Sequence, residues 1–199
     1  MTIVGFSQRI DFLKDRSELR ESLDSALVKI FSDLSYTCIP ISSFNSDLSL
    51  AEICLSCDYF VLSGGNDIGE YPTRDKLEYN VLNHSIFYKK PVLGICRGMQ
   101  TMLAHQEFVL HPVSGHANSR HNIFFHNEMD LSINVNSFHN YGIASRLINR
   151  SFKVIASSED DITEQIKHLH YPWSGIMWHP EREASLTDYD RNLIQNLFP

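Results

Sequence analysis

The stretch Pro91-Val-Leu-Gly94-Ile-Cys96-Arg-Gly98-Met-Gln100 decides how this chain folds. It opens with a short apolar run, which is typical of a buried β-strand, and continues with residues that suit a helix. Cys96 stands at the junction, with Gly94 and Gly98 two positions away on either side. Glycine has no Cβ, so a strand and a helix can approach closely at these positions. The pattern predicts a sharp strand–turn–helix from which the Cys96 side chain projects at the carboxyl end of a sheet.

Cys96 is therefore a candidate nucleophile. With four Cys and nine Gly in 199 residues, glycines would flank a cysteine in this way by chance about 0.008 times per chain. The start of the following helix carries a partial positive charge, which favours a thiolate over a thiol. We interpret Cys96 as a nucleophile; the alternative is a buried structural cysteine at a tight turn.

Strand and helix signals alternate along the first half of the chain. We predict strands at 2–6, 36–41, 59–62 and 91–96, and helices at 16–31, 47–54, 73–88 and from 97 onward. This alternation is typical of a parallel sheet with helices on both faces. The second half predicts short strands at 121–126, 131–135, 152–156, 166–170 and 176–178, and a closing helix at 185–197. We therefore expect a single domain, 1–199: an α/β three-layer sandwich with a mostly parallel central sheet and a small β-rich insertion before the last strand.

Composition argues against several classes of function. The 17 basic and 24 acidic residues give a net charge of −7, which opposes broad nucleic-acid binding because that requires a basic surface. No apolar run approaches the roughly 20 residues that span a bilayer, and the N-terminus shows no basic leader. Four Cys form no disulfide framework in a chain of this length. We expect a cytoplasmic protein with free thiols and with no nucleic-acid or membrane partner.

A thiol nucleophile needs an imidazole base, and a carboxylate usually orients that base. Ten His and 24 acidic residues produce a His-x-acid pattern by chance about 1.2 times, and the chain has three: His105-Gln-Glu107, His126-Asn-Glu128 and His179-Pro-Glu181. We assign His179 and Glu181, because they follow an apolar strand and positions i and i+2 of an extended segment face the same side. Pro180 favours that extended backbone. The pair at His126 is the strongest rival.

An acyl-transfer site also needs backbone N–H donors for the oxyanion. One donor is the N–H of Arg97, the residue after the nucleophile. Gly65 is a second candidate, because Ser63-Gly64-Gly65-Asn66 follows a strand that we expect beside the cysteine turn. Gln100 lies one helical turn beyond Cys96 on the same face and could reach a ligand held at the thiol. The polar stretch 136–142 could offer further contacts to a ligand.

The sequence predicts no cofactor and no metal site. Cys54 and Cys57 form a single C-x-x-C without a second pair, so we interpret them as small core or turn residues. Five histidines lie between His105 and His126, but their spacing matches no structural metal template. Their role stays open at this point.

Four motifs together resemble the class I glutamine amidotransferase superfamily: Leu62-Ser-Gly-Gly65, Gly94-Ile-Cys-Arg-Gly-Met-Gln100, Val135-Asn-Ser-Phe-His139 and Trp178-His-Pro-Glu181. They are most similar to its γ-glutamyl hydrolase branch, the peptidase C26 group, over about residues 58–183. The resemblance implies a flavodoxin-like fold with Cys96 as nucleophile, His179 as general base and acid, and Glu181 as its orienting partner. It implies an oxyanion hole at Gly65 and Arg97. It further implies substrate binding by Gly64, Gln100, Asn136, Ser137, Phe138 and His139.

The resemblance implies Cys-dependent hydrolysis of a γ-glutamyl amide or phosphoramidate bond in a small molecule, with release of glutamate. The segment after Gly-Gly-Asn-Asp-Ile is shorter here than in the family, Asn140 follows His139 where the branch often has Gln, and the whole chain is shorter. We therefore expect γ-glutamyl-CDP-amidate, a capsule-pathway substrate, rather than γ-glutamyl polyamines or γ-glutamyl-γ-aminobutyrate. The alternatives are a γ-glutamyl-polyamine or γ-glutamyl-γ-aminobutyrate hydrolase, a glutaminase subunit that delivers ammonia to a synthase partner, and a catalytically inactive binding module.

Overall fold

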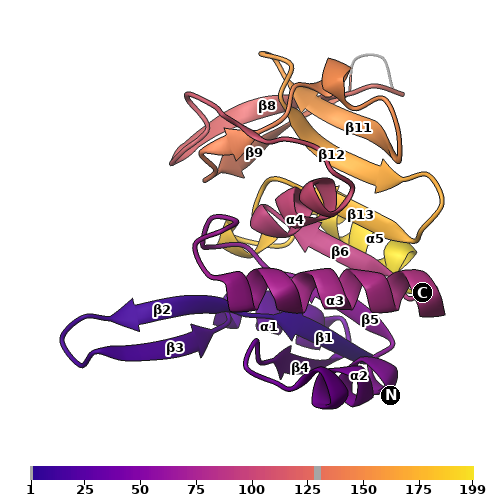
Figure 1. Ribbon diagram of the computed structural model, residues 1–199. Helices are drawn as coiled ribbons and strands as arrows, with labels where there is room; N and C mark the ends of the chain where they lie inside the picture. The colour runs from indigo at the N-terminus through magenta and orange to yellow at the C-terminus, as the bar shows by residue number, and fades with distance from the viewer. Residues whose placement is uncertain (1, 128–130) are drawn as a thin grey trace.

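One continuous β-sheet forms the centre of the computed structural model, which describes residues 2–127 and 131–199. Its nine described strands lie in the order β4-β1-β5-β6-β13-β12-β11-β8-β9 (Figure 1). The first five are parallel to one another: β4 (Thr37–Ile41), β1 (Ile3–Ser7), β5 (Tyr59–Leu62), β6 (Val92–Ile95) and β13 (Trp173–Ile176). Counted along the chain, these parallel strands are arranged 2-1-3-4-5, which is the order of flavodoxin-like folds.

The other four strands extend the same sheet beyond β13 with antiparallel pairing. They are β12 (Thr163–His168), β11 (Phe152–Ser158), β8 (Ser119–Phe125) and β9 (Ser132–Ser137). The predicted β-rich segment is present, but it is not a separate appendage. Because β13 pairs with β6 on one side and with β12 on the other, the two halves share one sheet. A short pair, β7 (His111–Pro112) with β10 (Tyr141–Gly142), lies outside that sheet.

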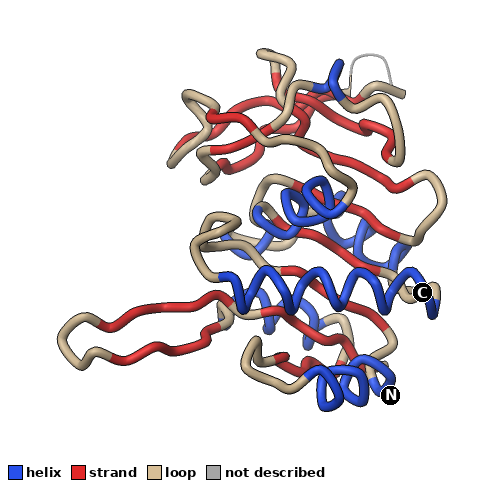
Figure 2. Tube along the Cα trace, viewed as in Figure 1, coloured by secondary structure: helices blue, strands red, loops and turns tan. Residues whose placement is uncertain are grey.

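Helices cover both faces of the sheet, which confirms the predicted three-layer α/β sandwich (Figure 2). The described α-helices are α1 (Ser25–Asp33), α2 (Asp47–Ser56), α3 (Pro72–Tyr88), α4 (Arg97–His105) and α5 (Asp188–Leu197). Helices α2, α3 and α4 share one buried apolar cluster that includes Leu82 and Met102. Helices α1 and α5 share a second cluster that includes Phe31 and Ile194. None of the helices in the described residues is long and apolar enough to cross a membrane.

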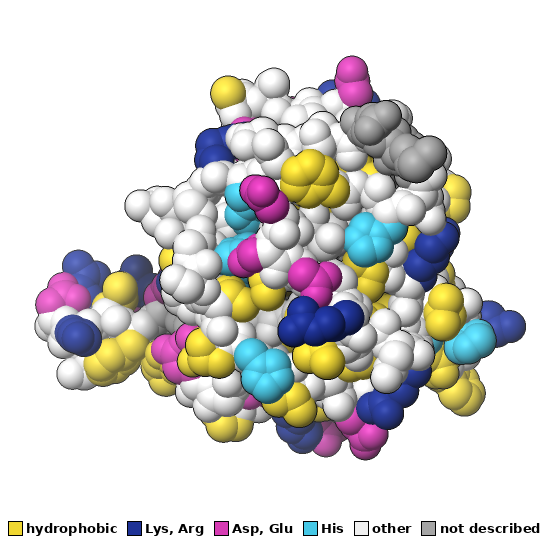
Figure 3. Space-filling view, turned by 90° about the horizontal axis from the view of Figure 1, so that it is seen from above, with side chains coloured by type: hydrophobic (Ala, Val, Ile, Leu, Met, Phe, Trp, Pro, Cys, Tyr) yellow, Lys and Arg dark blue, Asp and Glu magenta, His cyan; other side chains and the backbone are white. Residues whose placement is uncertain are grey.

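The region 16–31, predicted as one helix, contains half of a hairpin and a shorter helix instead. Strands β2 (Arg9–Leu13) and β3 (Glu18–Ser22) pair with each other and project from the body of the molecule (Figure 1, Figure 3). Leu19, which contributed to the helical spacing, is 51% exposed on β3. Helix α1 begins only at Ser25, because the Asp24 carboxylate accepts the N–H of Ala26 and caps it there. Strand pairing along the hairpin thus overrides the local apolar spacing.

The close approach of α4 to the sheet explains both glycines around Cys96. A Cβ at Gly94 would lie 2.6 Å from the carbonyl carbon of Gly98. A Cβ at Gly98 would lie 2.0 Å from the carbonyl oxygen of Leu62, at the end of β5. Both obstacles are backbone atoms, which cannot rotate away as the end of a flexible side chain can. The close strand–helix approach predicted from the sequence is therefore present, and it excludes any side chain at these two positions.

We expect Gly98→Ala to lower the free energy of unfolding by at least about 1–3 kcal/mol, the usual cost of overpacking a tight interior. The added methyl group must push α4 away from β5, because the atoms it meets are the carbonyl oxygen, carbonyl carbon and Cβ of Leu62, none of which can rotate away. Urea unfolding followed by circular dichroism measures the change. A variant as stable as the parent protein would show that the packing of α4 on β5 is looser than described here.

Candidate active site

The carboxyl ends of three neighbouring parallel strands meet at the candidate site. Strand β5 ends before Ser63, β6 ends before Cys96, and β13 ends shortly before His179. Since β6 lies between β5 and β13 in the sheet, the thiol is flanked by the Ser63–Asn66 turn on one side and by the histidine segment on the other. Open α/β sheets place ligands at this edge. The fold therefore brings together three motifs, the first and last of which are more than 110 positions apart in the sequence.

Cys96 has a strained backbone. Its φ is 51° and its ψ is −108°, a conformation that residues with a Cβ rarely adopt. The Cys96 N–H donates to the carbonyl of Ile176 on β13 at 2.7 Å, and its carbonyl accepts the Gln100 N–H as the first bond of α4. These bonds hold the strained residue at the strand–helix junction. Strain of this kind persists where the surroundings over-determine it, which is common at functional sites.

His179 connects the thiol to a carboxylate. Its Nδ1 lies 2.7 Å from Oε1 of Glu181, and the imidazole also hydrogen-bonds with Cys96. Because Nδ1 faces Glu181, Nε2 is the nitrogen left for the thiol. Burial lowers the pKa of His179, but the hydrogen bonds with Cys96 and Glu181 outweigh it and raise the pKa to about 9. The positively charged imidazolium is thus favoured at neutral pH, and its proton is lost as the pH rises through about 9.

Asn136 holds the backbone of His179 in place. The His179 N–H donates to Oδ1 of Asn136 at 3.0 Å, and Nδ2 of Asn136 donates to the carbonyl of His179 at 2.8 Å. On the opposite side, Gly64 lies against the ring, and a Cβ there would be 2.6 Å from Cε1 of His179. Asn136 was predicted to bind substrate, whereas the structure shows its amide bonded to the base segment. Gly64 likewise faces the base.

The Ser63–Asn66 turn is organised by Arg74, which the sequence analysis did not single out. The buried guanidinium donates to the carbonyls of Ser63, Gly64 and Gly65 at 2.7–3.0 Å. In a trans peptide the N–H points opposite to the carbonyl, so the N–H of Gly65 points away from Arg74. This orientation is compatible with the oxyanion role that the sequence predicts for the Gly65 N–H, and that role stays a prediction. Burial lowers the pKa of Arg74 to about 10, and Glu78 partly compensates by favouring the charged form.

Arg97 has separate roles for its backbone and its side chain. As the first residue of α4, it has an N–H without an intrahelical acceptor, which suits the predicted oxyanion role. Its side chain is buried and pairs with Glu78 and Asp75 on α3. Glu78 is also 3.0 Å from Nε of Arg74, so one buried carboxylate connects the two arginines. A weak signal for this network existed in the sequence, because Arg74 and Glu78 are four residues apart on the apolar face of a predicted helix.

The other predicted substrate contacts lie around the site with mostly buried side chains. Nε2 of Gln100 donates to the carbonyl of Tyr141 at 2.9 Å, and the Ser137 hydroxyl donates to the carbonyl of His116 at 2.6 Å. The Phe138 ring is 5.8 Å from the His179 ring and is 37% exposed. His139 is buried and its Nδ1 is 3.0 Å from the carbonyl of Tyr141. Their contacts with a substrate stay predictions.

The rival His-x-Glu pairs lie elsewhere. His105 is at the end of α4, where Nε2 lies 3.0 Å from Oδ1 of Asn83. His126 follows β8, and its Nε2 lies 2.9 Å from the hydroxyl of Ser157, whereas Glu128 falls outside the described residues. Burial and the neighbouring Cys57 raise the pKa of the Cys54 thiol to about 12, although Lys90 opposes the shift. The Cys54 thiol therefore stays protonated at neutral pH and is a poor nucleophile. The default interpretation of that C-x-x-C as buried core is consistent with this.

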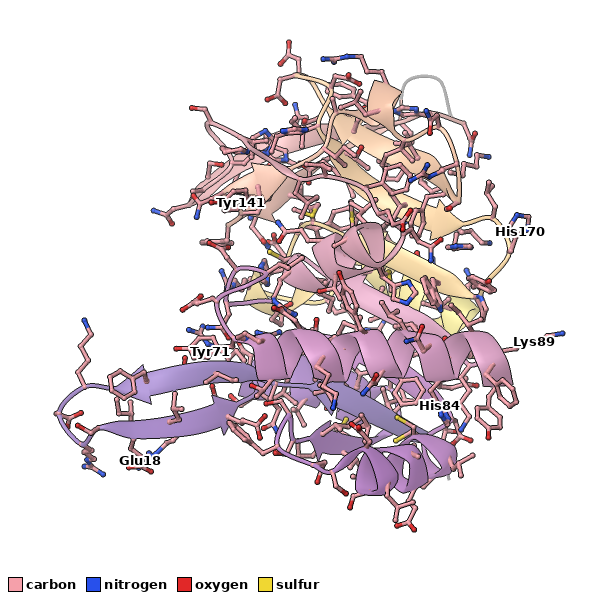
Figure 4. All side chains as sticks on the ribbon, viewed as in Figure 1. Glu18, Tyr71, His84, Lys89, Tyr141 and His170 are labelled. Atoms are coloured by element: carbon pink, nitrogen blue, oxygen red, sulfur yellow. The ribbon has the colours of Figure 1, made fainter. Side chains whose placement is uncertain are left out.

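Two cavities flank the candidate site. One of about 260 Å³ lies on the side of His179 and Glu181, where Gly64, Gly65, Arg9 and Arg182 also line it. The other, of about 300 Å³, is lined by Gln100 and Tyr141 together with apolar side chains. Figure 4 shows Tyr141 and Tyr71 on the side of the molecule from which the hairpin projects, while His84, Lys89 and His170 lie toward the opposite side. Cys96 itself lines neither cavity: the first borders the His179 and Glu181 side of the site, and the second borders Gln100.

Comparison with known proteins agrees with this geometry. Residues 17–181 match the family model of peptidase C26. The chain belongs to the peptidase C26 family. Gamma-glutamyl-CDP-amidate hydrolase of Campylobacter jejuni is 32% identical over 194 residues, which are 93% of this chain and 92% of that protein. Gamma-glutamyl-gamma-aminobutyrate hydrolase of Escherichia coli K12 is 25% identical over 158 residues, which are 66% of this chain and 61% of that protein.

A solved structure shows the same fold. The glutamine amidotransferase from Thermotoga maritima superimposes with a TM-score of 0.66 at 14% identity, over 98% of this chain and 81% of that one. Membership of the peptidase C26 family confirms the expected γ-glutamyl hydrolase branch of the class I glutamine amidotransferases. The chain is accordingly an enzyme of the γ-glutamyl hydrolase type.

We expect Cys96→Ala to lower the pKa of His179 from about 9 toward the ordinary histidine range. The substitution removes a hydrogen bond and a charge that favour the imidazolium, whereas burial, which disfavours it, is unchanged. An NMR pH titration of ¹³C-labelled histidine measures the midpoint. Cys38→Ala is the control, because that thiol lies on edge strand β4 and should leave the His179 titration as it was. An unaltered midpoint in the Cys96 variant would mean that the two groups do not interact.

Proposed function

We propose that this enzyme hydrolyses γ-glutamyl-CDP-amidate to glutamate and cytidine diphosphoramidate. The observation that carries the proposal is the hydrogen-bonded series Cys96–His179–Glu181 on a strained turn at the edge of the sheet. A thiol, a base and an orienting carboxylate in this order suit acyl transfer through a covalent intermediate. The likeness to a γ-glutamyl-CDP-amidate hydrolase along almost the whole chain supports the choice of substrate.

The chemistry follows from these positions. The Cys96 thiolate attacks the γ-carbonyl carbon, and the N–H groups of Gly65 and Arg97 stabilise the oxyanion. The C–N bond breaks as the His179 imidazolium gives its proton to the leaving nitrogen, and a γ-glutamyl thioester remains. A water molecule then attacks the thioester, and His179 takes a proton from that water. The C–S bond breaks, glutamate leaves and the Cys96 thiolate is restored. One water is consumed, and Glu181 stabilises the imidazolium throughout.

The cavity beside His179 suits a charged leaving group. Arg9 and Arg182 line it together with the acidic residues Asp11, Asp24 and Glu181. Nε of Arg9 pairs with Asp11 at 2.8 Å, so a phosphate would have to compete with that carboxylate for the guanidinium. Arg9 packs against the turn itself, because a Cβ on Gly65 would be 3.2 Å from the Arg9 Cβ. Guanidinium groups bind phosphate oxygens through charge-assisted hydrogen bonds. We therefore place the diphosphate at Arg9 and the glutamyl group on the Gln100 side of the thiol.

A substrate panel tests the proposal. Purified protein is incubated with γ-glutamyl-CDP-amidate, γ-glutamyl-γ-aminobutyrate or glutamine, and released glutamate is measured. We expect kcat/KM for the nucleotide amidate to exceed the others by at least about tenfold, which corresponds to a difference of about 1.4 kcal/mol in transition-state stabilisation. Cys96→Ala should abolish release from every substrate.

The other results of the panel have definite meanings. If the enzyme preferred γ-glutamyl-γ-aminobutyrate, the proposed substrate would be wrong but the proposed thioester mechanism would stand. Glutamine hydrolysis that appears only when a synthase is added would favour the ammonia-delivering subunit. If the Cys96→Ala variant turned over substrate as fast as the parent protein, Cys96 could not be the nucleophile.

We expect Arg9→Ala to reduce kcat/KM for γ-glutamyl-CDP-amidate by roughly 10- to 100-fold, because a hydrogen bond to a charged group contributes about 1.5–3 kcal/mol. The loss with γ-glutamyl-γ-aminobutyrate, which has no phosphate, should be smaller. Arg20→Ala is the matched control: Arg20 lies on the same hairpin and pairs with Glu18 as Arg9 pairs with Asp11, but it does not line the cavity. If Arg9→Ala lowered kcat/KM equally for both substrates, Arg9 would not be binding the diphosphate.

A further inference from the structure

Three histidines converge on a buried carboxylate behind the candidate active site. Glu164 on β12 is 1% exposed, and it is faced by His121 on β8, by His116 before that strand and by His139 after β9. The side chains of His116 and His139 are also buried, and that of His121 is 19% exposed. The hydrolytic chemistry described above uses none of these groups as acid, base or nucleophile.

The distances within the cluster are those of a coordination site. Oε1 of Glu164 lies 3.3 Å from Nδ1 of His116, 3.1 Å from Nε2 of His121 and 3.5 Å from Nε2 of His139. Zinc–ligand bonds of about 2.0–2.1 Å in a tetrahedron separate neighbouring ligand atoms by roughly 3.3 Å. Ligand atoms of His116, His121 and Glu164 all lie within 4.8 Å of one another. The donor atoms are thus already spaced as they would be around one ion.

The outer hydrogen bonds turn lone pairs toward the centre of the cluster. Nδ1 of His139 lies 3.0 Å from the carbonyl of Tyr141, which can only accept, so in a neutral ring Nε2 carries the lone pair. Nε2 of His116 lies 3.1 Å from the Asp160 carboxylate, so in a neutral ring its Nδ1 carries the lone pair. A carboxylate or carbonyl behind each ligating imidazole is the usual support of a metal site.

The carboxylate at the centre of the cluster lacks a donor. Neither oxygen of Glu164 accepts a well-directed hydrogen bond from the described residues, and Nε2 of His121 has no hydrogen-bond partner among them. Nδ1 of His116 and Nε2 of His139 lie 3.3 Å apart, so with both outer N–H groups in place these two nitrogens need a proton or a metal ion between them. A buried carboxylate without hydrogen bonds is costly, so the cluster needs positive charge from a metal ion or from added protons. A metal ion can accept all of these lone pairs at once, which favours it over protons.

We propose that His116, His121 and Glu164 bind one divalent transition-metal ion, with His139 beside them as a further nitrogen donor. Two imidazoles and one carboxylate with an open position form a ligand set that zinc accepts. The ion can enter from solvent, because His116, His121 and Asp160 line an open surface cavity of about 370 Å³. Figure 3 shows histidine and acidic side chains next to one another on the face above β8 and β9.

The proposed ion would fix the segment that supports the active site. It would join β8 and β12 to His139, which directly follows Phe138 at the His179 ring. The carbonyl of Tyr141 accepts a hydrogen bond from Gln100 and faces Nδ1 of His139, so it connects the cluster to helix α4. The role inferred for the ion is to position this segment; the hydrolysis needs no metal step.

Metal binding is tested directly, without reference to turnover. The full chain carrying Cys96→Ser, which removes the thiol–imidazole pair as a competing site, is stripped with a chelator and titrated calorimetrically with ZnCl₂. We expect one Zn²⁺ per chain and a rise in Tm on binding. Titration with Co²⁺ should give visible absorption without the near-ultraviolet band of thiolate ligands.

Variants in the same background locate the ion. His121→Ala and Glu164→Gln should abolish stoichiometric binding. Asp160→Asn, at a 57% exposed side chain that poses little risk to folding, should weaken affinity by about 10- to 100-fold through its effect on His116. His170→Ala, on an exposed histidine near the opposite end of the molecule (Figure 4), should bind as the parent does. Absence of binding in the parent, or full affinity in both His121→Ala and Asp160→Asn, would overturn the proposal.

Discussion

The contact between α4 and the end of β5 is the constraint on which the candidate site depends. Gly98 brings the helix onto the carbonyl of Leu62, so the chain must turn sharply between Ile95 and Arg97. That turn gives Cys96 its positive φ and leaves the Arg97 N–H without an intrahelical acceptor. Nucleophile position and oxyanion donor are therefore two results of one packing contact. A looser contact would cost the site both of them.

Buried charge then holds the neighbouring turn. Burying an isolated guanidinium or carboxylate is expensive, and the structure offsets this by surrounding Arg74 with three carbonyls and Glu78. Glu78 also pairs with Arg97, so the network reaches from the glycine turn to the start of α4. Such a network contributes orientation more clearly than stability, because its desolvation cost is large. It fixes the carbonyls of the turn on one side and frees the N–H groups on the other.

Local patterns in the sequence predicted the parts of the site that local geometry determines. The glycines two positions from Cys96 and the His179-Pro-Glu181 motif were sufficient to select the nucleophile, the base and the acid. The expected extended backbone holds only at His179, because Pro180–Arg182 form a 3-10 helix, and Glu181 reaches Nδ1 of His179 from that turn. Leu19 misled the helix prediction because pairing between β2 and β3 is a non-local interaction. Arg74 and Asn136 could not be assigned from the sequence, because their roles depend on which carbonyls the folded chain brings to them. The histidines around Glu164 come from β8, from the segment before it and from the segment after β9, and no spacing along the chain reveals their convergence.

The place of β13 in the sheet has a consequence for biosynthesis. This strand lies between β6 and β12, yet among the described strands it is the last in chain order, and His179 follows it by three residues. Until it is inserted, the nascent chain carries two unpaired strand edges, which are liable to association with other chains. The thiol of Cys96 likewise has no His179 imidazole beside it until the chain has been made past residue 179. Insertion of β13 into the sheet and assembly of the Cys96–His179 pair therefore occur together. A chain that ended before β13 would expose two strand edges and would lack the catalytic base.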